Sequence, residues 1–454
     1  MEPVKKSAEE LLKEANKLYG EKKYGEAVAL FKSAAEENNA EALYMLGICY
    51  NYNYVDDEPD KDKRAVIASV YFQKAADLGH ADAQCFSGLC YLHGIGVEKD
   101  ENKAVELLKK SAGQNCAAAM NNLGLLCDRG IGADDPEKAE EEGFNWFKKS
   151  AESGDPTGQL YTGIAYYEGS GVKRDFEKAV KMYSLAAQQG LAEALFRLGE
   201  CYDDGEGVDE NSIEAFKLYK LAAQRNHAKA QCYVGYCYEY GTGVSRDLGE
   251  AIKWYTVSAN NNYFQAYCNL GCCYEEGRGV KKDMKTAIEL YKKGAELGSL
   301  DAMFNLGNVY AFGKGVKVNN ELAVEYYARA AQSGHKEAQY NLAQHLSEGV
   351  GIEKDEEAAA FWFLQAAKKG DADAQYRIGW CYIQGIGVEE DDEKAFEWFS
   401  KAASQGDGDS QYTLGYCYEE GIGVEVDLDE AKDWYGRAAA QGHSKAKKAL
   451  KRFR

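Results

Sequence analysis

A Gly-x-Gly sequence that returns at a fixed interval constrains this chain more than any other feature. Its first glycine occurs at Gly94, Gly130, Gly169, Gly205, Gly241, Gly277, Gly313, Gly349, Gly385 and Gly421. All the steps are equal except the one from Gly130 to Gly169, which is slightly longer. A repeat with a period of about 36 residues indicates a solenoid, in which each unit packs on its neighbours.

The pattern in one unit, residues 228–263, predicts two helices joined by a loop. Gly241 and Gly243 interrupt the first helix, because two glycines in three residues weaken any helix. Asp247 then occupies a position where its carboxylate accepts from the free N–H groups that begin a second helix. Apolar side chains recur at helical spacing on both sides of the loop: Ala230, Tyr233, Val234, Cys237 and Tyr238, then Ala251, Ile252, Trp254, Tyr255 and Ala259.

Both helix boundaries recur along the chain. The expected N-caps of the second helices are Asp100, Asp175, Asn211, Asp247, Asp283, Asn319, Asp355, Asp391 and Asp427. The expected exits, where glycine or asparagine tolerates a left-handed conformation, are Asn38, Gly79, Asn115, Gly154, Gly190, Asn226, Asn262, Gly298, Gly334, Gly370, Gly406 and Gly442. Two boundary signals in register predict a helix–loop–helix unit.

This pattern resembles the Sel1-like repeat family, relatives of the tetratricopeptide repeats. One unit carries nearly the whole motif: Ala374, Ile378, Gly379, Tyr382, Gly385, Gly387, Val388, Asp391, Lys394, Ala395, Trp398, Phe399, Ala402, Ala403 and Gly406. The resemblance covers about residues 40–443, in eleven units. It implies an all-α, right-handed α/α superhelix that serves as a protein–protein adaptor, with no family chemistry.

The two ends of the chain depart from the repeat. Residues 1–39 include a helical pair without the Gly-x-Gly loop, which resembles a tetratricopeptide hairpin and is expected to cap the array. Residues 444–454 are strongly basic and are expected to form a final capping helix, since cations suit a helix C-terminus. A docking or targeting role is the alternative for this tail.

Two units are irregular. The step from Gly47 to Gly88 is longer than the regular step, and the loop expected at positions 50–64 contains three tyrosines. This loop is either a solvated insertion or a binding element. In the third unit, Pro136 is placed at a first helical position, and four extra residues separate Ala139 from Trp146. They predict a longer second helix.

The charge of the chain restricts its partners. The formal net charge is −20, which excludes a general nucleic-acid or anionic-lipid binder and favours basic partners. The sequence begins without a signal-peptide pattern and has no apolar stretch of about 18 residues, so we expect a cytoplasmic protein without membrane insertion.

The cysteines and the aromatic pairs are expected to be structural. Seven of the 13 cysteines share one place, two residues after the first-helix glycine: Cys49, Cys90, Cys201, Cys237, Cys273, Cys381 and Cys417. We expect buried free thiols there. Some secreted relatives carry one disulfide per repeat, but these second helices lack cysteine. The pairs Trp254-Tyr255, Trp362-Phe363, Trp398-Phe399 and Trp434-Tyr435 are expected to pack between repeats.

No pattern predicts catalysis, a metal or a cofactor. The glycine pairs lack the Gly-Lys-Ser/Thr continuation of a phosphate loop, so we interpret them as turns. The six histidines, His80, His93, His227, His335, His345 and His443, show no metal-ligand spacing. The chain is therefore not expected to be an enzyme.

The candidate binding surface comes from the resemblance, which implies that first helices line a concave groove. Four places in each unit, counted from the first-helix glycine, should face it. They hold Glu200, Asp203, Asp204, Tyr236, Glu239, Tyr240, Glu275 and Glu276 in the fifth to seventh units, and Tyr376, Trp380, Tyr412, Tyr416, Glu419 and Glu420 in the last two. An acidic groove with aromatic side chains suits Lys/Arg-containing proteins or peptides. The alternative is that these residues are ordinary solvated helix ends.

We therefore expect a non-catalytic protein-interaction scaffold. The alternatives are a regulatory or activator subunit of an enzyme complex, an exported effector of an intracellular pathogen that acts on host proteins, and a self-assembling structural protein.

Overall fold

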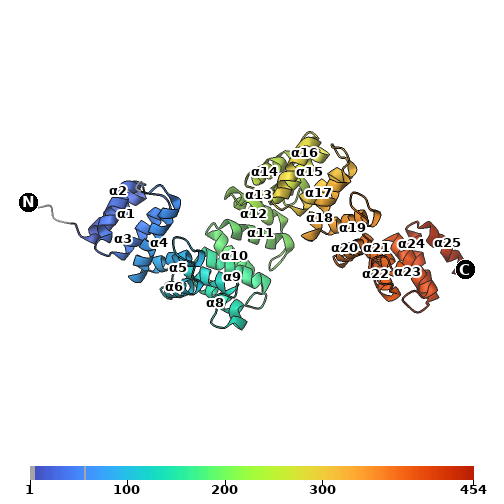
Figure 1. The fold of residues 1–454 in the computed structure, drawn as a ribbon, viewed down its shortest axis with the longest axis horizontal. Helices are drawn as coiled ribbons and strands as arrows, with labels where there is room; N and C mark the ends of the chain where they lie inside the picture. The colour runs from blue at the N-terminus through green and yellow to red at the C-terminus, as the bar shows by residue number, and fades with distance from the viewer. Residues whose placement is uncertain (1–5, 56–57, 454) are drawn as a thin grey trace, which may run out of the picture. The chain divides into compact units, whose positions relative to one another are not determined.

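The computed structural model describes residues 6–55 and 58–453, and these residues form only helices and loops. The chain divides into two compact units, one of residues up to Ala230 with Thr242–Val244, the other of Gln231–Gly241 with the residues from Ser245 onward. Within each unit, helical hairpins follow one another along the chain (Figure 1). The predicted all-α solenoid is confirmed.

The helices alternate between first and second members of a hairpin. The first half of the chain contains α1 (Ala8–Gly20), α2 (Tyr24–Ala35), α3 (Ala40–Asn51), α4 (Lys61–Asp77), α5 (Ala81–His93), α6 (Glu101–Gly113), α7 (Ala117–Cys127), the 3₁₀ helix η1 (Pro136–Lys138), α8 (Ala139–Glu152), α9 (Pro156–Glu168), α10 (Phe176–Gln188), α11 (Ala192–Asp204) and α12 (Ser212–Gln224). The second half contains α13 (Ala228–Tyr240), α14 (Leu248–Asn260), α15 (Phe264–Glu276), α16 (Met284–Glu296), α17 (Leu300–Phe312), α18 (Asn320–Gln332), α19 (Lys336–Glu348), α20 (Glu356–Lys368), α21 (Ala372–Gln384), α22 (Asp392–Ser404), α23 (Gly408–Glu420), α24 (Leu428–Ala440), α25 (Ser444–Ala449) and the 3₁₀ helix η2 (Leu450–Phe453).

Both predicted helix boundaries are confirmed at every position. Each of the nine expected N-cap side chains accepts a hydrogen bond from a backbone N–H in the first turn of its helix. Each of the twelve expected exits has a positive φ, between 56° at Asn38 and 97° at Gly298. These local signals set the hairpin length before any packing is considered.

A large ring on the second helix packs against a glycine on the first helix of the same hairpin. In α15 and α16, a Cβ added to Gly271 would lie 2.5 Å from Cε1 of Tyr291, whose side chain is fully buried. The predicted core role of the aromatic pairs is confirmed most fully for the second members, which are buried, and Trp362 and Trp398 are partly buried against the core. Tyr255 packs on Gly235 of its own hairpin, whereas Trp254 is half-buried.

The second glycine of each loop fixes the contact between consecutive repeats. A Cβ on Gly243 would lie 2.0 Å from the carbonyl oxygen of Ser212, at the start of the preceding second helix. The same 2.0 Å approach joins Gly387 to Glu356. The prediction that these glycines make turns is confirmed, and the close approach adds a reason why no side chain is accepted.

This contact also corrects the interpretation of the third unit. Gly171 lies against the carbonyl of Glu140. These two residues are as far apart in the sequence as Gly243 and Ser212, so the extra residues of the third unit must lie before Glu140. They form the turn η1 rather than a longer helix, and α8 has 14 residues where most second helices have 13. The predicted extra helical turn is therefore wrong.

The insertion in the first unit is divided between a helix and a loop. Tyr50 ends up within α3, and α4 has 17 residues because it begins at Lys61, inside the expected loop. The ring of Tyr54 stacks on Tyr24 of α2, with centroids 4.0 Å apart, so this tyrosine packs on the N-terminal hairpin. The part of the predicted loop at Asp56 and Asp57 lies outside the described residues.

Histidine joins neighbouring repeats at four places. At one of them, Nδ1 of His227 accepts from the N–H of Ala230 and so caps α13, 3.0 Å away. Its Nε2 lies 2.8 Å from a carboxylate oxygen of Glu193, and its ring stacks on Phe196. The other three joints of this kind are made by His80 with Glu41, His335 with Asp301 and His443 with Asp409.

The C-terminal tail covers the last hairpin. It forms α25 and η2 as expected for a capping helix, and Ala446 and Ala449 are buried. The ring of Phe453 lies 6.0 Å from that of Tyr435. All thirteen cysteines are free thiols, and ten of them are buried. Of the seven that were predicted to be buried free thiols, six are buried and Cys381 is half-buried.

Candidate partner-binding surface

Some consecutive first helices contact one another in each unit. The contacts are α5 with α7 and α7 with α9 in the first unit, and α15 with α17 in the second. Among the described residues, no two consecutive second helices meet to this extent. That first-helix side chains line a concave face stays a prediction from the resemblance.

Three of the predicted groove carboxylates accept a short hydrogen bond from a buried tyrosine. The hydroxyl of Tyr255 donates to Oε2 of Glu239 at 2.7 Å, and that of Tyr291 donates to Oε2 of Glu275 at 2.7 Å. In the last hairpin, Tyr435 donates to Glu419 at 2.6 Å. The position four residues after the glycine is therefore a structural acceptor for the ring that packs on that glycine.

Each of these carboxylates also has a cation from within the chain. Glu239 pairs with Arg278, and Glu275 pairs with Lys314, whose Nζ lies 2.7 Å away. Burial raises the pKa of Glu275, but hydrogen bonds from Lys314 and Tyr291 outweigh it and leave the pKa below its usual value. Both cations occupy the middle position of a Gly-x-Gly loop one repeat later.

The last carboxylate of this series is neutralised by the tail. Nη2 of Arg452 lies 2.9 Å from Oε2 of Glu419. Glu239 is only 4% exposed. Charge at these three positions is therefore largely satisfied inside the protein.

In the first unit the predicted carboxylates differ in exposure. Glu200 is half-buried and lies 3.0 Å from Nζ of Lys229. Asp203 accepts a longer hydrogen bond, 3.4 Å, from the hydroxyl of Tyr219. Asp204 is exposed.

The exposed residues of the predicted surface include a pair of neighbouring aromatic side chains on α13. Tyr236 is 48% exposed and Tyr240 is 57% exposed, and their ring centroids are 4.6 Å apart. Nη1 of Arg278 lies 3.5 Å from the hydroxyl of Tyr240. Glu276, exposed beside them, forms an ion pair with Arg278, and its Oε2 lies 2.8 Å from Nε.

In the last two repeats the predicted residues divide into packed and exposed groups. Tyr376 and Trp380 are half-buried and both contact the ring of Phe399. Tyr412 is half-buried against Tyr435. The exposed members of this set are Tyr416 and Glu420.

The sequence interpretation missed one prominent surface residue. Phe312 is 70% exposed at the end of α17. It occupies the same place in its repeat as Tyr240 and Glu276 in theirs, five residues after the first-helix glycine. Applying the same position to the next repeat would have identified Phe312 as a candidate.

Twelve consecutive segments match the family model described as Sel1 repeat. They are residues 17–39, 40–80, 81–116, 117–155, 156–191, 192–227, 228–263, 264–299, 300–335, 336–371, 372–407 and 408–443. The chain belongs to the Sel1-repeat family. Proteins built from Sel1 repeats generally mediate protein–protein interactions.

Two solved Sel1-repeat structures resemble the chain along most of their length. A protective antigen from uropathogenic Escherichia coli is 33% identical, with a TM-score of 0.58, and the match covers 94% of this chain and 90% of that one. A Sel1 repeat protein from Oxalobacter formigenes is 32% identical, with a TM-score of 0.53, over 68% of this chain and 90% of that one.

Curated Sel1-repeat relatives match over shorter stretches. DAP3-binding cell death enhancer 1 of Rattus norvegicus is 35% identical over 194 residues, which covers 34% of this chain and 37% of the relative. Chitin synthase regulator SKT5 of Saccharomyces cerevisiae is 33% identical, over 34% of this chain and 22% of the relative. The chain thus spans well under half the length of these relatives.

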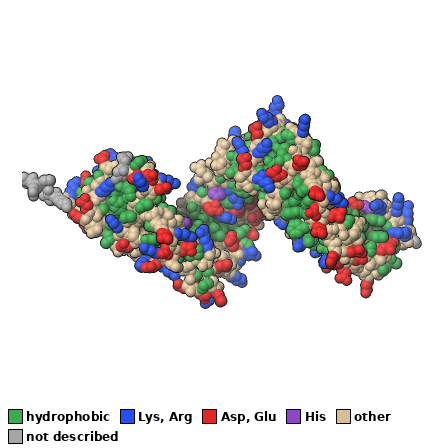
Figure 2. Space-filling view, in the orientation of Figure 1, with side chains coloured by type: hydrophobic (Ala, Val, Ile, Leu, Met, Phe, Trp, Pro, Cys, Tyr) green, Lys and Arg blue, Asp and Glu red, His purple; other side chains and the backbone are tan. Residues whose placement is uncertain are grey.

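The described residues of this Sel1-repeat protein contain no candidate metal site and no candidate membrane-spanning helix. Residues 6–55 and 58–453 contain no group of three metal-ligating side chains placed to hold an ion. None of their helices has the length and apolar character needed to cross a bilayer. In Figure 2, Lys and Arg gather at the C-terminal end over α25, whereas both signs of charge are mixed elsewhere on the face in view.

Proposed function

We propose that this Sel1-repeat protein is a non-catalytic scaffold that holds a partner protein against the first-helix face around Tyr236 and Tyr240. The observation that carries the proposal is the exposure of this ring pair. Two adjacent tyrosines that stay about half exposed offer a large, rigid contact area at little cost in side-chain entropy. Phe312 extends the set of exposed aromatic side chains in the same unit.

The proposed partner supplies Lys or Arg. The exposed Glu276 lies beside the tyrosines, and a cation over a tyrosine ring gains about 0.5–2 kcal/mol. The net charge of −20 adds long-range attraction for basic proteins. The tyrosine-held carboxylates Glu239 and Glu275 support this face rather than meet the ligand directly, because their side chains are only 5% and 19% exposed, whereas that of Glu276 is 59% exposed beside Arg278.

The test is partner capture from native cells with a Tyr236→Ser, Tyr240→Ser variant. We expect bound proteins to be lost from this variant and binding to the parent chain to weaken with salt. A Val257→Ser variant is the control, because Val257 is 42% exposed on a second helix of the same unit. Equal capture by parent and double variant would contradict the proposal, and loss of capture only from the control would move the site to the second helices.

A second candidate is a regulatory subunit of an enzyme complex. The relatives named chitin synthase regulator SKT5 and, in Arabidopsis thaliana, ERAD-associated E3 ubiquitin-protein ligase component HRD3B favour it. Purification of a stoichiometric complex with an enzyme whose activity changes on binding would support this function. Free thiols at all thirteen cysteines support a reducing compartment, and we propose the cytoplasm.

A further inference from the structure

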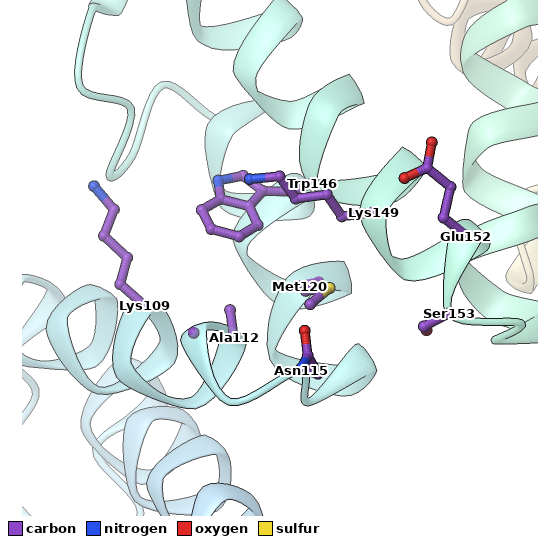
Figure 3. Close-up of a pocket in the computed structure, with 9 residues that line it drawn as sticks. Lys109, Ala112, Asn115, Met120, Trp146, Lys149, Glu152 and Ser153 are labelled. Atoms are coloured by element: carbon purple, nitrogen blue, oxygen red, sulfur yellow. The ribbon is translucent and has the colours of Figure 1, made fainter.

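A cleft of about 520 Å³ lies on the second-helix side of the first unit, between α6, α7 and α8 (Figure 3). Trp146 of α8 and Met120 of α7 provide its apolar surfaces, with Ala112 at the end of α6. Lys109 and Lys149 approach it from separate helices, and Glu152 lies at the other side. None of these residues belongs to the first-helix face around Tyr236.

A glycine keeps this cleft open. Gly113 is the last residue of α6, and no other second helix from α4 to α24 ends in glycine. The others end in Asp77, Glu152, Gln188, Gln224, Asn260, Glu296, Gln332, Lys368, Ser404 and Ala440. A Cβ on Gly113 would meet no heavy atom within 4 Å. Packing therefore does not require this glycine, although glycine is a weaker helix former than alanine.

The cations near the cleft are only partly neutralised. Nζ of Lys149 lies over the Trp146 ring, 4.4 Å from its centroid, and Glu152 pairs with Lys148, whose Nζ is 4.0 Å from Oε1. Nζ of Lys109 is 2.6 Å from Asp134, whose side chain is 83% exposed. An incoming carboxylate can meet Lys149 and compete with a solvent-exposed partner for Lys109.

We propose that this cleft binds an acidic segment of a partner protein, with a bulky apolar side chain between Trp146 and Met120 and a neighbouring carboxylate at Lys149 and Lys109. Apolar surface beneath two cations fits an apolar residue flanked by Asp or Glu. The site is separate from the first-helix surface and has the opposite charge preference, so the scaffold would hold two chemically different partners.

The test uses the full chain labelled with 5-fluorotryptophan and a synthetic peptide, acetyl-Gly-Asp-Glu-Phe-Asp-Gly-amide. The ¹⁹F resonance of Trp146, assigned with a Trp146→Phe variant, is followed during titration. We expect a saturable shift of this resonance. A peptide with Lys in place of each acidic residue, and one with Ala in place of Phe, should bind at least tenfold more weakly.

Gly113→Gln is the decisive variant, because α10, α12 and α18 end in Gln without disturbance of the repeat. We expect it to fold with unchanged helicity and to bind the acidic peptide at least tenfold more weakly. Ala440→Gln, at the matching position of α24, should leave binding unchanged. Lys149→Gln should weaken binding about threefold.

Three results would overturn the proposal. They are no saturable Trp146 shift up to about 10 mM acidic peptide, equal binding of the lysine peptide, and undiminished binding by Gly113→Gln. Because Tyr236 and Tyr240 are outside the cleft, their double variant should bind the acidic peptide normally. The first-helix proposal and this one can therefore fail separately.

Discussion

At the scale of single residues, a few buried polar atoms have no hydrogen-bond partner in the described part of the chain, and the cause is clear for one of them. In five repeats a Gln or Asn stands directly before the exit residue and donates to Oε1 of a glutamine on the first helix. Gln405, for example, donates to Gln375 at 2.8 Å. In the repeat of α19 and α20 the residue before the exit is Lys369, and it donates to the carbonyl of Gly334 instead. Oε1 of Gln339 is left without a donor.

Lys369→Gln should therefore stabilise the protein. Its amide can reach both the carbonyl of Gly334 and Oε1 of Gln339, as Gln441 does for Gly406 and Gln411. A hydrogen bond gained by a buried acceptor is worth about 1 kcal/mol. Urea unfolding with an unchanged slope would measure the gain. The matched variant Lys368→Gln, exposed one residue earlier, should have no comparable effect, and equal gains from both would exclude this explanation.

Glu193 makes stability depend on acid pH. A hydrogen bond from His227, supplemented by Arg197, lowers the pKa of Glu193 from 4.5 to about 2. A carboxyl with a lowered folded-state pKa stabilises the fold above its unfolded value, and this stability is lost as pH falls from about 4.5 to 2. The side chain is 37% exposed, so solvent screening reduces the contribution to about 1 kcal/mol.

The expected result for Glu193→Gln is a loss of about 1 kcal/mol at pH 7 that shrinks as the pH approaches 2. Denaturant unfolding at a series of pH values measures it. Glu177→Gln is the control, because this exposed residue of α10 makes no such contact with a histidine of the next repeat. A deficit of Glu193→Gln that stayed constant from pH 7 to pH 2 would show that the ionised carboxylate is not the source.

At the scale of helices, the glycine–ring contact predicts opposite effects for two Gly→Ala changes. Gly271→Ala places a methyl 2.5 Å from the ring of Tyr291, which cannot shift freely because its hydroxyl is bound to Glu275. We expect a loss of about 1–2 kcal/mol, since overpacking outweighs the gain in helix propensity. Gly113→Ala meets no atom and should gain up to about 1 kcal/mol.

Thermal and urea unfolding of both variants would check this pair. Ala343 already occupies the glycine place opposite Phe363, a ring without a hydroxyl to anchor it. A Gly271→Ala, Tyr291→Phe double variant should therefore recover part of the loss. Equal stability of the two single variants would contradict the contact as described.

The helical elements could be predicted from the sequence because their signals are local. Asp247 caps α14 and Asn262 turns out of it by interactions within a few residues, and both repeat at a fixed spacing. The extra residues before α8 were misplaced, because their position depends on the carbonyl of Glu140, which contacts Gly171 in the next repeat. Sequence spacing alone does not reveal that contact.

The candidate surface was predictable only in outline for the same reason. Tyr236 and Tyr240 are exposed at the expected positions. Glu239 has the same spacing and sign as a groove residue, but the buried hydroxyl of Tyr255 and the guanidinium of Arg278 satisfy it. Those partners come from a second helix and from the next loop, so only tertiary packing reveals them.

At the scale of the whole molecule, stability should be a sum of repeats and their interfaces. The C-terminal tail then protects the last hairpin before any other. An Ala446→Asp, Ala449→Asp variant inserts charge into the buried side of α25. We expect faster hydrogen exchange in α23 and α24, with no change in α3 and α4.

Hydrogen exchange followed by mass spectrometry distinguishes local opening of the last hairpin from global unfolding. Lys447→Asp is the control, because Lys447 is exposed on the same helix. If the double variant accelerated exchange equally in α3 and α4, the repeats would unfold as one cooperative body and the nearest-neighbour description would fail.

The contact between a loop glycine and the start of the preceding second helix also restricts how the length of the gene can change. Gly243 meets Ser212, Gly279 meets Leu248 and Gly423 meets Asp392, each pair with the same separation in the sequence. A deletion or insertion of a single amino acid inside that interval separates glycine from carbonyl, whereas a copied segment of one whole repeat brings its own matching pair. Genes for such chains can thus lengthen by duplication in whole-unit steps, and the extra residues of the third unit lie outside that interval, before Glu140.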